Sequence, residues 1–147
     1  SYAEAVIPIN IGIPGAKLGL PNIVTVLLMY SAGNAAAFTI GLLRIVLSGF
    51  MFGNLFAIAY SAAGLCASFA VMALLKKSGV FGMIGVSTAG GVMHNIGQIA
   101  IAVLLTNGSV LSYLPVTLAA GIIAGIVIGI LSGILNKRLS VFLKKLS

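Results

Sequence analysis

Residues 90–98 read Gly-Gly-Val-Met-His-Asn-Ile-Gly-Gln, and this polar stretch lies inside an otherwise apolar segment. It contains the only histidine of the chain, next to one amide side chain and close to a second. At helical spacing, Gly91, His94 or Asn95, and Gln98 share one face. Polar side chains at bilayer depth usually face a bundle interior or a water-filled cavity, because they are costly in lipid. We therefore interpret the stretch as one wall of a ligand pocket in a helical membrane protein.

The composition of the whole chain indicates a membrane protein. Hydrophobic residues make up 61% of the 147 residues, charged residues make up 6%, and the mean hydropathy is +1.25. A soluble domain of this size could not cover its surface with so few charged groups. The formal charge of +7 comes from eight Lys and Arg against one acid, Glu4. No basic patch is interleaved with aromatic residues on a polar chain, so we expect no nucleic-acid partner.

The residue types present argue against several kinds of chemistry. One histidine and one acid cannot supply the usual ligand set of a metal ion, and Cys66 stands alone. The chain has no Walker A loop for a nucleotide and no aspartate for Mg²⁺-diphosphate chemistry. A catalytic triad cannot be assembled from these residues. We therefore expect a binding protein without a cofactor, not an enzyme.

Apolar segments separated by Gly, Pro and Asn predict the membrane spans. The predicted spans are residues 21–32, 35–52, 54–75, 80–105 and 114–136, preceded by a partial span at residues 1–8. We expect the partial span to be the end of a truncated first helix. An amphipathic tail, residues 137–147, could lie at the membrane interface. The expected architecture is a single integral membrane domain, an all-α polytopic bundle of six helices.

Positive charges predict the orientation of this bundle. Six of the eight cations fall at two helix ends that two spans separate: Lys76, Lys77, Lys137, Arg138, Lys144 and Lys145. By the positive-inside rule, both ends and the C-terminus face the cytoplasm. The Gly- and Pro-rich loop at residues 9–22 then faces the outside.

A row of glycines runs along the last predicted span. Gly121, Gly125, Gly129 and Gly133 repeat at intervals of four residues. Such stripes of small residues let helices approach closely in lipid. The row predicts either packing within the chain or docking of a partner membrane protein.

Arg44 is a second unusual residue, because it lies inside the predicted span 35–52. An arginine at the centre of a membrane helix is unfavourable by about 2.5–3.5 kcal/mol on insertion scales, so it calls for a partner or a wet cavity. Arg44 could pair with Glu4, contact an anionic ligand, or extend to the outer interface. Lys17, in the Gly/Pro loop, is either solvated or a cation in a lid over the outer mouth of the pocket.

Three motifs, in this order, resemble the Gx transporter family, which is also labelled heptaprenyl diphosphate synthase component I. They are PGAKLGLPNIV at residues 14–24, Leu42-Leu43-Arg44 with Gly49 and Phe52-Gly53, and HNIGQ at residues 94–98. The likeness covers nearly the whole chain. The family looks related to the substrate-binding S components of energy-coupling-factor (ECF) transporters. Those are six-helix proteins with both termini inside and a first extracellular loop that caps a pocket in the outer half.

The resemblance implies an S-component-like protein in the cell membrane of a prokaryote. It implies capture of a small anionic or polar-headed molecule from outside, with a transmembrane coupling subunit and two cytoplasmic ATPases as partners. The substrate-binding residues that it implies are Lys17, Asn22, Arg44, His94, Asn95 and Gln98. The alternative is a non-transporting membrane subunit associated with quinone or isoprenoid metabolism or with a quinone-linked electron-transfer complex.

Overall fold

The structure, a computed structural model, describes residues 20–52, 54–106 and 108–146. Its elements are α2 (Leu20–Ser31), α3 (Asn34–Phe52), α4 (Leu55–Ser78), α5 (Met83–Thr106), the short 3-10 helix η1 (Ser109–Tyr113) and α6 (Leu114–Leu146). No strand occurs within these described ranges. For this part of the chain, the prediction of an all-α protein is confirmed.

Local signals in the sequence explain both ends of α4. The Asn54 side chain accepts a hydrogen bond of 2.8 Å from the backbone N–H of Ala57, as an N-cap residue does. At the other end, Gly79 has a φ of 69°, a left-handed conformation that glycine adopts without strain. The helix extends beyond the predicted end at residue 75, because the cap is Gly79 and the lysines before it remain helical.

Three helical stretches among the described residues are long and apolar enough to cross a membrane: Asn34–Met51, Leu55–Ser78 and Ser109–Phe142. α5 is as long as α4, with 24 residues, but it carries His94, Asn95 and Gln98 and is not among the three. α2 has only 12 residues, fewer than the ~20 that the hydrocarbon core requires. These helices indicate a membrane protein, whereas the full set of six predicted spans is not established. The first predicted span, residues 1–8, lies outside the described residues.

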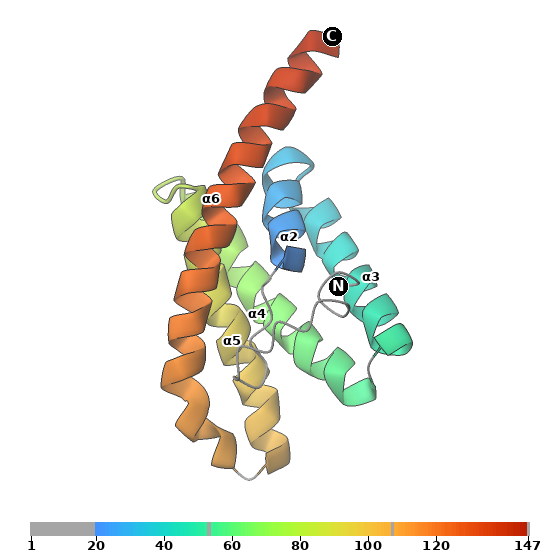
Figure 1. Cartoon of the computed structure of the whole chain (residues 1–147), viewed down its shortest axis with the longest axis vertical. Helices are drawn as coiled ribbons and strands as arrows, with labels where there is room; N and C mark the ends of the chain where they lie inside the picture. Colours follow the sequence, from blue (N-terminus) through green and yellow to red (C-terminus); the bar gives the residue numbers. More distant parts are fainter. Residues whose placement is uncertain (1–19, 53, 107, 147) are drawn as a thin grey trace.

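The helices form a bundle in which α5 packs between α4 and α6 (Figure 1). Met83, at the start of α5, faces Gly133, which lies next to the basic part of α6 (residues 137–145). α5 therefore runs antiparallel to α6, and it also runs antiparallel to α4 (Figure 1). The α2–α3 turn, the C-terminal end of α4 and the basic part of α6 therefore lie at one end of the bundle, the upper end in Figure 1. We call this end the basic end. The cations that the sequence predicts on one side of the membrane thus share one end of the bundle.

α6 is a single helix of 33 residues, which corresponds to a length of about 50 Å. The hydrocarbon core of a bilayer is only ~30 Å thick, so part of α6 must lie outside it. The predicted amphipathic tail, residues 137–147, continues α6 without a break as far as Leu146 and projects beyond the other helices (Figure 1).

A compact apolar core joins the described helices α2 to α6 near the basic end. Its buried side chains are Val26 and Met29 of α2, Ala37 of α3, Met72 of α4, Val86 of α5 and Ile128 of α6. In lipid, such contacts stabilise a bundle through packing, because the surrounding tails are as apolar as the side chains. The apolar core therefore holds α2 and the other four described helices together at the basic end of the bundle.

Glycines allow the backbones of α5 and α6 to touch. A Cβ atom on Gly91 would lie 2.4 Å from the carbonyl oxygen of Gly121, and one on Gly125 would lie 2.6 Å from Cα of Thr88. Real Cβ atoms do not approach other atoms so closely, so only glycine fits at these positions. The glycine row of α6 is therefore used for packing within the chain, which was one of the two predicted roles.

Gly125→Ala should force α5 and α6 apart, because the added methyl group would meet backbone atoms that cannot turn away. Gly133→Ala is the matched control, since the nearest atom to its added Cβ is Met83 Sδ at 4.0 Å. We expect the first change to lower the free energy of unfolding by about 1–3 kcal/mol. The control should keep or slightly raise it, because alanine favours helix. Equal melting temperatures of the two variants in detergent would contradict this packing.

Candidate functional site

The polar side chains at the middle of α5 divide between its two neighbouring helices. A Cβ atom on Gly64 of α4 would lie 2.8 Å from His94 Cε1 and 2.9 Å from Gln98 Cγ. Asn95 turns to α6, where its Nδ2 donates a hydrogen bond to the carbonyl of Thr117. The structure therefore brings His94 and Gln98 together against Gly64, and it places Asn95 at a different interface.

Within the described part of the chain, His94 is hydrogen-bonded through one ring nitrogen. The ring bonds to the backbone of Gly64, and Nε2 is the nitrogen that lies beside this glycine. Because the N–H of a residue inside a helix is already bonded to the preceding turn, the carbonyl of Gly64 is the acceptor and Nε2 donates. Nδ1 is buried and has no hydrogen-bond partner among the described residues. In the neutral ring, Nδ1 is then an acceptor that the described chain does not satisfy.

Arg44 brings a positive charge to the same region. It lies near the middle of α3, is half-buried, and its charge acts on the His94 imidazole. One terminal nitrogen, Nη1, is buried without a hydrogen bond among the described residues, although the side chain makes other interactions. Arg44, Gly64, His94 and Gln98 are referred to below as the central polar cluster.

The central polar cluster occupies one level of the bundle, on the side of the apolar core that is away from the basic end. On each of three helices, seven or eight residues separate the buried core residue from the cluster residue. These pairs are Ala37 and Arg44 on α3, Met72 and Gly64 on α4, and Val86 and His94 on α5. At 1.5 Å per residue, these intervals correspond to about 10–12 Å. Three helices thus place their unusual residues at a similar depth.

Two predicted site residues belong to the N-terminal part of the chain. Asn22 lies in the first turn of α2, not in the predicted loop at residues 9–22, and it is half-buried. It precedes the core residue Met29 by seven residues, so its backbone stands at the level of the central polar cluster. Lys17 lies outside the described residues.

Gly64 is the member of the cluster that the sequence reasoning missed. It lies in a span rich in alanine, so its composition does not distinguish it. A useful signal would have been that a histidine inside a helix bundle needs a small residue opposite it on the neighbouring helix.

Among the described residues, no group of three or more His, Cys, Asp or Glu side chains could hold a metal ion. The groups that the central polar cluster offers are hydrogen-bonding atoms and the charge of Arg44.

Comparison with known protein families matches residues 1–135 to the family described as heptaprenyl diphosphate synthase component I. No curated protein and no solved structure matches the chain.

Asn95→Ala should weaken the contact between α5 and α6, because it removes the hydrogen bond to Thr117. Interhelical hydrogen bonds in membranes contribute about 0.5–2 kcal/mol, so we expect a measurable fall in the melting temperature in detergent. Ser140→Ala is the control, since the Ser140 hydroxyl donates to the carbonyl of Lys137 in its own turn and to no other helix that the structure describes. An unchanged melting temperature for Asn95→Ala would show that this side chain does not hold the two helices together.

Proposed function

The chain belongs to the heptaprenyl diphosphate synthase component I family, and on this basis we propose that it is a membrane subunit that binds a small polar-headed or anionic molecule at the central polar cluster. One observation carries the proposal. His94 Nδ1 is a buried hydrogen-bonding atom without a partner among the described residues, and it lies within the electrostatic influence of Arg44. An unsatisfied buried polar atom is unfavourable by about 1–3 kcal/mol, so a ligand that supplies its partner stabilises the bundle.

The cluster has a definite preference for the head group. Neutral His94 offers an acceptor at Nδ1, whereas the Arg44 guanidinium offers only donors. A ligand that contacts both His94 Nδ1 and Arg44 Nη1 carries a hydroxyl or N–H group close to an anionic or carbonyl oxygen. No Asp or Glu occurs among the described residues, since the one acid of the chain is Glu4. The net charge of the chain, +7, favours an anionic head over a cationic one.

We propose that the bound molecule is captured from outside and that the protein acts as the S component of an ECF-type importer. A transmembrane coupling subunit and two cytoplasmic ATPases would then drive transport. The depth of the cluster supports this role. If the basic end faces the cytoplasm, the cluster lies beyond the apolar core toward the outer side, where a ligand can enter from outside while the core closes the inner end.

The family description favours a second candidate, a non-catalytic membrane subunit linked to isoprenoid metabolism. A prenyl diphosphate has an anionic head and a long apolar tail, so its head could occupy the same cluster. The chain contains no aspartate to hold Mg²⁺ and diphosphate, which favours binding over synthesis. Co-purification with ATPase subunits supports the importer, whereas co-purification with a prenyl synthase supports the second role.

Arg44→Gln and His94→Gln should each reduce the amount of ligand that co-purifies with the protein, measured by mass spectrometry of the extracted small molecules. Each change removes a buried hydrogen bond or charge, so we expect a loss of about tenfold or more. Lys137→Gln, which removes a charge from the exposed part of α6, is the control and should keep the ligand. Full retention in both cluster variants would remove the site assignment.

Cysteine labelling tests the proposed orientation. Ser112 is exposed in η1, away from the basic end, and Ser140 is exposed in the basic part of α6. In a Cys66→Ala background, a membrane-impermeant maleimide applied to intact cells should label Ser112→Cys and not Ser140→Cys. Permeabilised cells should show labelling of both. The reverse pattern in intact cells would place the basic end outside.

A further inference from the structure

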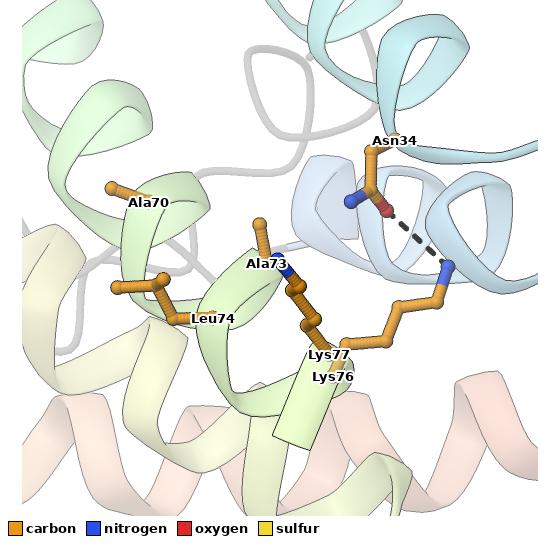
Figure 2. Close-up of a pocket in the computed structure, with 6 residues that line it drawn as sticks. All are labelled: Asn34, Ala70, Ala73, Leu74, Lys76 and Lys77. Carbon is orange, nitrogen blue, oxygen red and sulfur yellow. Dashed lines mark hydrogen bonds between the residues drawn. The ribbon is translucent and has the colours of Figure 1, made fainter. Parts of the chain in front are cut away.

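A groove opens at the basic end, between the C-terminal part of α4 and the start of α3 (Figure 2). Its volume is about 530 Å³, and it is lined by Asn34, Ala70, Ala73, Leu74, Lys76 and Lys77. We call it the basic-end groove. Its three apolar residues precede the lysines on α4, so they lie closer to the middle of the bundle. The groove therefore has an apolar floor and a polar, basic rim.

Lys76 is held in place by the neighbouring helices. Its Nζ donates to the carbonyl of Met29 in the last turn of α2 and to Oδ1 of Asn34 at 3.2 Å. It also lies 5.1 Å from the centroid of the Tyr30 ring. These partners are all neutral, although the C-terminus of α2 carries a partial negative charge. Lys76 thus ties α2 and α3 to α4, and no carboxylate side chain among the described residues compensates its charge.

Lys77 is exposed, and its side chain diverges from that of Lys76, which bonds to Asn34 (Figure 2). No carboxylate side chain occurs among the described residues to neutralise either lysine, because Glu4 is the only acid of the chain. Asn34 is also the first residue of α3, whose N-terminus adds a partial positive charge. The rim of the groove is therefore a site of positive charge at the edge of a membrane-embedded bundle.

We propose that the basic-end groove binds one anionic phospholipid, with its phosphate at Lys77 and Asn34 and an acyl chain along Ala70, Ala73 and Leu74. Basic pockets between membrane helices attract anionic head groups, and small alanines leave room for a chain against α4. Ala70 precedes Lys77 by seven residues, about 10 Å along the helix, so a head at the interface places the chain in the hydrocarbon region. This site is separate from the central polar cluster and does not depend on the function proposed for it.

Native mass spectrometry of the full chain, titrated with phosphatidylglycerol or phosphatidylcholine, tests the proposal. We expect one phosphatidylglycerol to bind more tightly than any phosphatidylcholine. Lys77→Gln should weaken that binding about fivefold, the contribution of one lysine near an anionic surface. Lys137→Gln makes the same charge change on the exposed part of α6 and should leave it unchanged. Equal affinity for the two lipids, or equal losses in the two variants, would overturn the proposal.

A second variant distinguishes a lipid from a soluble anion. Ala70 is exposed, so Ala70→Phe can fold while its ring occupies the floor of the groove and leaves every charge in place. We expect it to weaken phosphatidylglycerol binding as Lys77→Gln does, without a change in melting temperature. Inorganic phosphate that competes with the lipid, together with unchanged lipid binding in Ala70→Phe, would assign the rim to a soluble anion and overturn the lipid site.

Discussion

The close contact of α5 with both of its neighbours is the constraint on which the rest of the structure depends. On one side, a Cβ atom on Gly97 would lie 2.6 Å from the carbonyl oxygen of Ala63, and on the other side Gly91 meets Gly121. Because the backbone of α5 is held so close to its neighbours, a large polar side chain on α5 fits only opposite a residue that has no side chain, such as Gly64. The positions of its polar groups therefore follow from the glycines around them.

This constraint separates two kinds of polar group in an apolar bundle. Asn95 and Lys76 bond to backbone carbonyls of other helices, so their polarity is used for assembly. His94 differs, because one nitrogen is anchored to Gly64 and the other has no partner among the described residues. A buried polar atom that has no hydrogen bond to a neighbouring helix is the better indicator of a binding site, because a bound ligand can offset the unfavourable free energy of its burial.

The sequence predicted the helices well, because caps and apolar runs are local signals. The predicted span 80–105 corresponds to α5 (Met83–Thr106), and the span 35–52 corresponds to α3. The arrangement of side chains could not be predicted as well. His94 and Asn95 are adjacent, so a helical period of 3.6 residues allows either to face α4, and only the position of Gly64 decides between them. The hydrogen bond from Lys76 to α2 could not be predicted either, because lysines are common at the cytoplasmic ends of membrane helices whether or not they contact another helix.

The most direct test of a ligand site at this level of the bundle is an experimental structure of the protein in lipid nanodiscs, purified without added ligand. We expect density for a non-protein group within hydrogen-bonding distance of His94 Nδ1, on the side that faces Arg44. A map in which Nδ1 bonds to another side chain of this protein, with protein atoms filling the space up to Arg44, would contradict this expectation.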